Sequence, residues 1–310
     1  MVRYRWWPGA AACLILVTAA VLAETARPDP ADAPPERVDL LAIGDWEYRD
    51  GNKPTTARAM AEYAAAQGTP VRAAILLGDN FRLHLKKDKR PQLETIFEAT
   101  YDPQRLNFPF YALLGNHDGE SDNRRIEMAY AKEHPDSRWK MPARWYRVDL
   151  PAEAPLVTIL ALDSNKSDMS SKQWQAQKQW LEAELAKPRA PWTVCAAHRP
   201  LFSNGMHGDS SRMQSEWGPI LKKYRVDFHL SGHEHALEHL EIDGWPTTFL
   251  VLGGGGGRLR AEGKAKHGPF SKSSLGFAHL MFDSARARAR LIDGRGAVLH
   301  EFSREVQGSE

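Results

Sequence analysis

The sequence predicts an α/β fold, because short apolar runs alternate with helical patterns through most of the 310 residues. Several apolar runs end in polar side chains that can bind metal. No break in composition divides residues 37–303, which are therefore predicted to form one domain. With 42% hydrophobic and 26% charged residues, the chain is neither disordered nor collagen-like. Its formal net charge of +2 argues against a protein dedicated to nucleic-acid binding.

Residues 1–23 are predicted to be a signal peptide. Arg3 and Arg5 precede an uncharged apolar run, which ends in the cleavage pattern Val21-Leu22-Ala23. The alternative is an uncleaved anchor, although the run is short for a membrane-spanning helix. Cleavage would leave Cys195 as the one cysteine, so no internal disulfide could form. This predicts an exported protein, periplasmic or secreted, without stable membrane association.

The remaining segments follow in order along the chain. Residues 24–36 are rich in proline and predict an extended linker, and residues 304–310 predict a C-terminal tail. Helices are predicted at Thr55–Gln67, which ends before a glycine, and at Ser171–Lys187, which places apolar residues on one face. Strands are predicted at 38–43, 71–77, 110–114, 156–162, 193–197, 226–230, 237–242, 247–252, 277–283, 286–292 and 297–302.

Metal-binding residue types stand at the ends of five predicted strands. They are Asp45, Asp79, Asn116, His198 and the pair His233 and His235. In open α/β sheets ligands bind at the carboxyl ends of strands, so these side chains are expected to converge. Two carboxylates, one amide and three imidazoles suit Mn, Fe or Zn better than Mg or Ca, and the lack of thiolates argues against a structural zinc site. Six ligands are too many for one ion but suit two ions that share a bridging carboxylate.

The order of these motifs resembles that of the calcineurin-like metallophosphoesterases, and within them the small purple acid phosphatases of the tartrate-resistant type. The resemblance covers residues 38–303 and implies a four-layer α/β/β/α metallophosphoesterase sandwich. The motifs that carry it are Gly44-Asp45-Trp46, Gly78-Asp79-Asn80-Phe81, Gly115-Asn116-His117-Asp118, Ala197-His198-x-Pro200, Gly232-His233-Glu234-His235 and Gly276-Phe277-Ala278.

The same resemblance implies how the six ligands divide between two ions. Asp45, Asp79 and His235 would hold the first ion, with Asp79 bridging to the second. The remaining ligands of the second ion would be Asn116, His198 and His233.

Three further residues receive roles by resemblance. His117 would bind the phosphate or protonate the leaving group, and Asp118 is expected to orient it. His207 resembles a histidine that contacts substrate in the tartrate-resistant type.

The sequence departs from purple acid phosphatases at two positions. Arg82 stands where those enzymes have a metal-binding tyrosine, and Glu47 stands at a position that carries a metal-binding histidine in other metallophosphoesterases. Glu47 would restore the negative charge of the missing tyrosinate, so we expect it to ligate the first ion or to order water on it. Arg82 cannot ligate a metal, but it could grip a substrate phosphate. The alternative is that these two residues form only a surface ion pair.

The resemblance implies a phosphoester hydrolase that uses two metal ions, Fe, Mn or Zn. An acid-phosphatase-like phosphomonoesterase is favoured, in which a hydroxide held by the ions attacks phosphorus in line. The expected substrates are phosphorylated small molecules or phosphoproteins, and no nucleic acid is expected as a partner. The alternatives are a phosphodiesterase of the same fold, or a catalytically impaired protein that binds metal or phosphate.

Two other features are predicted to lie outside the site. Gly253–Gly257 lacks the lysine and hydroxyl residue of a phosphate-binding Walker loop, so a flexible loop at the rim is favoured. Arg286, Arg288 and Arg290 alternate with alanine, so in a strand they would share one exposed face.

Overall fold

The apolar runs form two seven-stranded sheets in the computed structural model. The structure describes residues 37–46, 52–81, 90–120, 122–261, 263 and 266–307, which belong to one compact unit. The predicted signal peptide, the linker, Glu47 and Arg82 lie outside the described residues.

The first sheet combines a parallel half with an antiparallel half. Strands β1 to β4 pair in parallel, whereas β12, β13 and β14 extend the sheet antiparallel from β1. In order across the sheet the strands are β14 (Val298–Glu305), β13 (Arg286–Asp293), β12 (Gly276–Asp283), β1 (Arg37–Ile43), β2 (Val71–Leu76), β3 (Phe110–Ala112) and β4 (Trp139–Lys140).

The second sheet has a parallel centre with antiparallel edges. Strands β6, β7, β8 and β10 run in parallel, and β5, β9 and β11 pair antiparallel with their neighbours. In order across the sheet the strands are β11 (Gly268–Lys272), β9 (Leu237–Glu241), β10 (Thr248–Leu252), β8 (Phe228–Ser231), β7 (Trp192–Ala197), β6 (Val157–Leu162) and β5 (Tyr146–Leu150).

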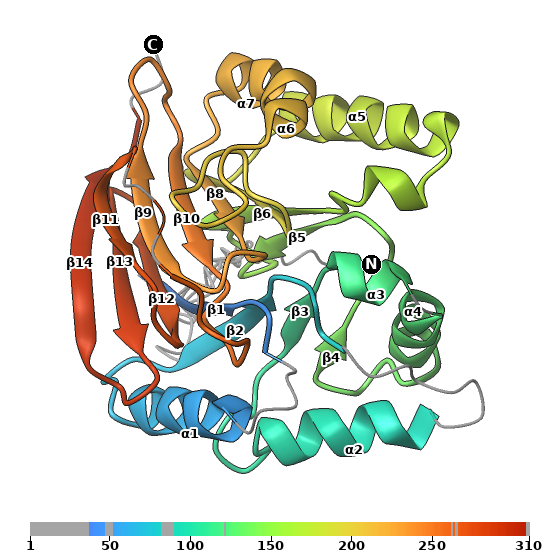
Figure 1. The fold of residues 1–310 in the computed structure, drawn as a ribbon, viewed down its shortest axis with the longest axis vertical. Coiled ribbons are helices and arrows are strands. Elements are labelled where there is room, and N and C mark those ends of the chain that lie inside the picture. The colour runs from blue at the N-terminus through green and yellow to red at the C-terminus, as the bar shows by residue number, and fades with distance from the viewer. Residues whose placement is uncertain are drawn as a thin grey trace, which may run out of the picture. The chain divides into compact units, whose positions relative to one another are not determined.

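Helices cover the outer face of each sheet (Figure 1). Helices α1, α2 and α4 pack on the first sheet, and α5, α6 and α7 pack on the second. The helices are α1 (Asn52–Ala65), α2 (Arg90–Thr100), α3 (Asn116–Glu120), α4 (Asn123–Glu133), the short 3₁₀ turn η1 (Lys166–Asp168), α5 (Ser171–Ala186), α6 (Ser211–Glu216) and α7 (Gly218–Lys223).

The alternation of side chains along β1 explains why the fold has four layers. Val38, Leu40 and Ala42 are buried between the two sheets, where they join apolar residues of β6 and β8. Leu41 and Ile43 point to the other face and pack with α1 and α2. A third core lies between the second sheet and α5, α6 and α7. Successive strand residues point to opposite faces, so a wholly apolar strand serves two cores at once. The predicted α/β/β/α sandwich is confirmed.

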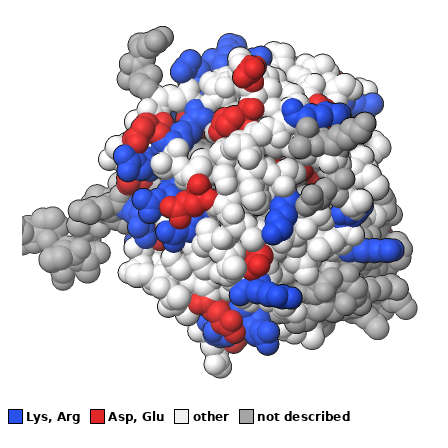
Figure 2. Space-filling view, turned by 60° about the vertical axis from the view of Figure 1, so that its left-hand side comes forward, with Lys and Arg blue, Asp and Glu red and all other residues white. Residues whose placement is uncertain are grey.

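The arginines of β13 lie on an exposed face, as their alternation predicts. Arg286 pairs with Glu305 at 2.8 Å, and Arg290 pairs with Glu301 at 2.5 Å. Figure 2 shows acidic and basic side chains side by side on the side of the molecule that carries β13 and β14. These arginines are therefore locally neutralised. Among the described residues, no helix is long and apolar enough to cross a bilayer.

Candidate metal centre

The candidate site lies where the parallel strands of both sheets end. Asp45, Asp79 and Asn116 follow β1, β2 and β3 of the first sheet. His198 follows β7 of the second sheet, and the segment His233–His235 follows β8. The carboxyl ends of adjacent parallel strands meet at one sheet edge, so six side chains distant in sequence come to one place.

Distances within the site are those of a ligand cluster. Ligand atoms of the buried residues Asp45, Asp79 and His198 all lie within 4.8 Å of one another. His198 Nε2 lies 3.1 Å from Asn116 Oδ1, 3.4 Å from Asp79 Oδ1 and 3.2 Å from His233 Nδ1. Three other predicted ligands therefore surround the Nε2 atom of His198.

The sixth predicted ligand lies beside Asp45. His235 Nε2 is 3.6 Å from Asp45 Oδ1. Among the described residues, Asp45 Oδ1 accepts no hydrogen bond although it is buried. A buried carboxylate oxygen is costly to leave unsatisfied, and a cation would satisfy it. The mixed oxygen and nitrogen donors thus fit Fe, Mn or Zn.

The tautomers of two histidines follow from their backbone partners. His198 Nδ1 lies 2.8 Å from the Leu77 carbonyl, and His235 Nδ1 lies 2.6 Å from the Arg258 carbonyl. A carbonyl can only accept, so each Nδ1 carries the hydrogen and each Nε2 presents a lone pair to the cluster. Burial lowers the pKa of His235, but the neighbouring Asp45 carboxylate and the Arg258 carbonyl outweigh it and raise the pKa overall.

His233 is held in the opposite tautomer. Arg199 Nη1 lies 2.9 Å from His233 Nε2, and a guanidinium can only donate. Nε2 of His233 therefore accepts, and in the neutral ring Nδ1 carries the hydrogen toward His198 Nε2. Burial lowers the pKa of His233, and the neighbouring His198 and Arg199 lower it further. The ring is thus kept neutral, with its proton on the nitrogen that faces the cluster.

Three predicted ligands have left-handed backbone conformations. The φ angles are 56° at Asp45, 51° at Asp79 and 71° at His233. Asp and His reach this region more readily than branched residues, and they turn their side chains sharply at the strand ends. Gly115 allows the close approach of the next loop, because a Cβ there would lie 2.0 Å from the Asp79 amide nitrogen.

The glycine run 253–257 packs against the loop that carries His235. The run is buried, so the expected flexible rim loop is wrong in that respect. A Cβ on Gly257 would lie 2.6 Å from the His235 ring, and one on Gly253 would lie 2.1 Å from the Glu234 carbonyl. The glycines let the chain pass directly against the ligand loop.

His117 and Asp118 take different positions. The His117 amide donates to Asp79 Oδ1 at 2.9 Å, and its partly exposed Nε2 lies 3.8 Å from Asp79 Oδ2. Asp118 is fully buried and accepts from the amides of Gly115 and Phe81 at 2.8 and 3.0 Å. Burial, with the charge of Asp79, raises the pKa of Asp118 to about 7. Asp118 therefore fastens the second and third ligand loops to each other.

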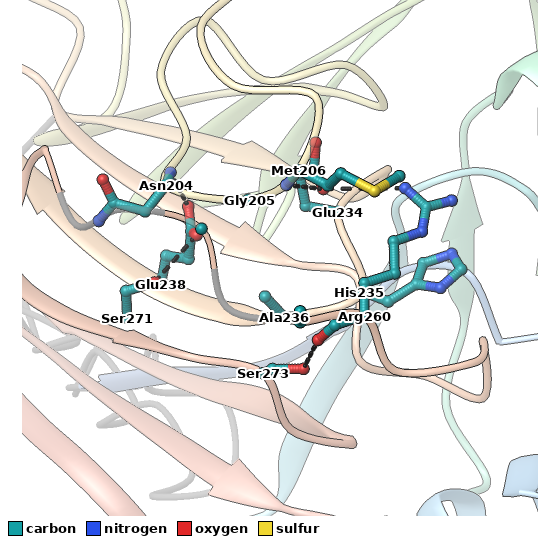
Figure 3. A pocket seen from close by; sticks show the side chains of 12 residues that line it. Asn204, Gly205, Met206, Glu234, His235, Ala236, Glu238, Arg260, Ser271 and Ser273 are labelled. Carbon is teal, nitrogen blue, oxygen red and sulfur yellow. Dashed lines mark hydrogen bonds and ion pairs between the residues drawn. The ribbon is translucent and has the colours of Figure 1, made fainter.

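His207 lies over the second-sheet ligands. Its ring stacks on His233 with centroids 4.5 Å apart, and its Nδ1 lies 2.8 Å from Glu234 Oε1. Arg260 Nη1 is 2.9 Å from His207 Nδ1 and 3.9 Å from Glu234 Oε2. Figure 3 shows Arg260 and Met206 at the edge of a small pocket beside His235.

The sequence prediction omitted Arg199, Glu234 and Arg260 from the site. The first two lie inside quoted motifs, as the middle residue of His-x-Pro and of His-x-His. Their places in the sequence, directly beside predicted ligands, could have indicated that they belong to the site. Arg260 follows the glycine run, and its place became visible only in the structure.

Comparison with known proteins agrees with this geometry. A model of the calcineurin-like phosphoesterase family matches residues 38–237, more than half of the chain. Tartrate-resistant acid phosphatase type 5 of Sus scrofa is 32% identical over 268 residues, which cover 78% of this chain and 77% of that protein. Purple acid phosphatase 17 of Arabidopsis thaliana is 28% identical over 290 residues, which cover 86% of this chain and 83% of that protein.

A solved structure adds evidence for the fold. GAP50, described as the anchor in the inner membrane complex of Plasmodium, superposes with a TM-score of 0.75 at 20% identity, covering 88% of this chain and 90% of that one. At this identity the likeness concerns the fold alone. The family match and the 32% identical relative show that the chain belongs to the calcineurin-like phosphoesterase family and is a metal-dependent phosphohydrolase similar to the purple acid phosphatases.

Proposed function

We propose that the protein is an exported, acid-phosphatase-like phosphomonoesterase that works with two ions of Fe, Mn or Zn. The observation that carries the proposal is the meeting of six oxygen and nitrogen donors from two sheets around His198 and Asp45. The acid phosphatases among its relatives support the monoester reaction. Phosphorylated small molecules or phosphoproteins are the proposed substrates. Export rests on the basic start and apolar run of residues 1–23.

Each ligand has a proposed place. Asp45, Asp79 and His235 hold the first ion, and Asn116, His198 and His233 hold the second, with Asp79 shared. When bound, two such ions supply Lewis acidity and neutralise charge on the phosphoryl oxygens.

The residues around the ligands handle the substrate. His117, partly exposed beside Asp79, donates a proton through its ring to the oxygen of the leaving group. Asp118 positions this segment through its bonds to the backbone. Asn116 and His207 contact the phosphate group from the two sides of the ligand cluster.

Glu47 and Arg82 are proposed to complete the first-ion side. Glu47 supplies the third negative charge that a tyrosinate supplies in purple acid phosphatases. Arg82 binds substrate phosphate, since a guanidinium can donate two parallel hydrogen bonds to phosphoryl oxygens.

The experiment that tests the proposal measures metal content together with hydrolysis of 4-nitrophenyl phosphate and bis(4-nitrophenyl) phosphate. We expect about two metal equivalents and a kcat/KM for the monoester at least about tenfold above that for the diester. Faster hydrolysis of the diester would establish the phosphodiesterase alternative. Bound metal without hydrolysis of either ester would establish the impaired binding protein.

A further inference from the structure

Arg199 is a cation that lies beside the candidate metal centre. Among the described residues it forms no ion pair, and its side chain makes one hydrogen bond, to His233 Nε2. The residue is half-buried, so its charge is only partly hydrated. A cation in this setting favours an anionic partner.

A second arginine approaches the same pair of rings. Arg260 contacts His207, whose ring stacks on His233, and Arg199 contacts His233 itself. The neighbouring carboxylate of Glu234 already accepts hydrogen bonds from the amides of residues 206 and 207 and from the His207 ring. Two guanidinium groups therefore lie beside this pair of rings, and only that of Arg260 reaches the Glu234 carboxylate, which is largely engaged by other donors.

The guanidinium of Arg199 is separated from the metal-ligand atoms by the His233 ring. His233 turns Nδ1 toward the cluster and Nε2 toward Arg199. The guanidinium thus lies beyond the imidazole, on the side away from the other ligands. When the phosphoryl group of a substrate lies at the ligand cluster, Arg199 remains available to bind another part of the same substrate.

Metal binding would also release Arg199 from His233. To ligate through Nδ1, the neutral ring must move its hydrogen to Nε2. Nε2–H and the guanidinium N–H would then face each other as two donors, so their hydrogen bond is lost. The loaded site therefore frees Arg199 to donate to an anion.

We propose that Arg199 and Arg260 form a subsite for a second anionic group of the substrate, a carboxylate or a second phosphate separate from the scissile one. This inference rests on the proposed phosphomonoesterase function and adds a substrate class, the phosphomonoesters with a second negative charge. Met206, 64% accessible, lines the pocket together with Arg260, and Leu259, 41% accessible, precedes Arg260 in the chain, so both are available to contact an apolar spacer between the two charges.

The test uses three non-hydrolysable probes on the full-length, metal-loaded protein: benzylphosphonate, 4-carbamoylbenzylphosphonate and 4-carboxybenzylphosphonate. The last two match in size and differ in charge. By titration calorimetry we expect the carboxylate probe to bind about tenfold more tightly than the carbamoyl probe, as a charge-assisted hydrogen bond would give. The double variant Arg199→Ala/Arg260→Ala should reduce this ratio to within about twofold of unity.

Two controls isolate the effect. Arg212→Ala removes an exposed arginine of α6 and should keep the tenfold ratio. Arg199→Lys should keep only part of it, because lysine lacks the planar fork of donors. Metal content and thermal unfolding of each variant check that the site is intact.

The outcomes separate the two proposals. If the wild type hydrolyses 4-nitrophenyl phosphate but shows no preference for the carboxylate probe, the subsite is wrong and the phosphatase stands. The subsite is equally wrong if the preference survives in a folded, metal-loaded double variant. If the wild type neither hydrolyses monoesters nor binds any phosphonate, the proposed function itself fails.

Discussion

The two sheets contribute different atoms to the candidate metal centre. The first sheet supplies only oxygen donors among the predicted ligands, from Asp45, Asp79 and Asn116. The second sheet supplies only nitrogen donors, from three histidines. In the proposed division, each ion is bound by both sheets. Metal binding therefore links the two sheets at the edge where their parallel strands end.

The two sides also differ in how ready they are to bind. The first sheet's carboxylates present acceptor oxygens whenever they are ionised. On the second sheet, His198 and His235 already present lone pairs, whereas Arg199 holds His233 in the tautomer that cannot ligate through Nδ1. The ligands of the first sheet can therefore bind an ion as they are, whereas on the second sheet His233 must first move one proton from Nδ1 to Nε2.

The largest expected effect comes from Asp79, the carboxylate of the first sheet that both ions are proposed to share. Asp79→Asn removes a charge assigned to both ions, so we expect loss of both metals and a fall in kcat/KM of at least about 1,000-fold. His233→Ala should lose about one metal equivalent and about 100-fold in kcat/KM. Metal analysis and hydrolysis of 4-nitrophenyl phosphate measure both. The exposed His134→Ala is the control. Equal metal loss in the two site variants would contradict the bridging role of Asp79.

A smaller effect sharpens the oxygen side of the comparison. Glu47→Ala should weaken binding of the first ion, so metal content falls below two equivalents after dialysis and kcat/KM drops about tenfold. Glu47→Gln distinguishes the effect of the negative charge from that of the ligating oxygen, because glutamine keeps the oxygen and lacks the charge. The visible spectrum gives a second measure. A purple wild type would indicate a tyrosinate ligand and exclude the proposed replacement.

A last effect, on stability and not on activity, compares two buried titratable groups, one in each sheet. Burial lowers the pKa of His229, on β8, to about 3. Burial alone would raise the pKa of Asp39, on β1, but the neighbouring His279 and the hydrogen bonds from Arg37 outweigh it and leave the pKa lowered. Unfolded His229 takes up a proton below about pH 6.5, whereas the folded residue stays neutral until about pH 3, so stability is lost as pH falls through this range.

Urea unfolding of metal-free protein at pH 7 and pH 5 measures this loss. His229→Phe should lose about 2 kcal/mol less than the wild type between these pH values, at about 1.4 kcal/mol per unit below pH 6.5. The difference between the two pH values cancels the change in packing. Asp39→Asn should cost the same at both, because its carboxyl is ionised at pH 5 whether folded or unfolded. A wild type that loses no more than His229→Phe would show that the folded residue binds a proton too.

Much of this architecture was predictable because its signals are local. Apolar runs such as Val38–Ile43 and Leu156–Leu162 predicted strands close to the observed bounds, and the pattern of Ser171–Lys187 predicted helix α5. Helices α2, α3, α4, α6 and α7 and strands β4, β5 and β11 were missed. They are short or strongly polar, and tertiary packing decides their structure more than propensity does.

The six candidate ligands were predictable for a different reason. Each follows a strand directly, so the topology of parallel strands brings them together without further information. Arg199 and Arg260 were not predicted as site residues, because their roles depend on where long side chains end. The stacking of His207 on His233 likewise depends on a loop fold that no periodicity encodes.

The left-handed torsions at Asp45, Asp79 and His233 have a consequence for engineering this chain. Glycine adopts such torsions without steric cost, whereas other residues carry strain of about 1 kcal/mol or more at each position. Glycine at any of these three positions would relieve the strain but remove a candidate ligand, and at Asp45 and Asp79 it would also remove the carboxylate that accepts a hydrogen bond from a backbone amide. Metal binding and relief of backbone strain therefore favour different residues at these positions. A screen for thermally stable variants must also measure metal content.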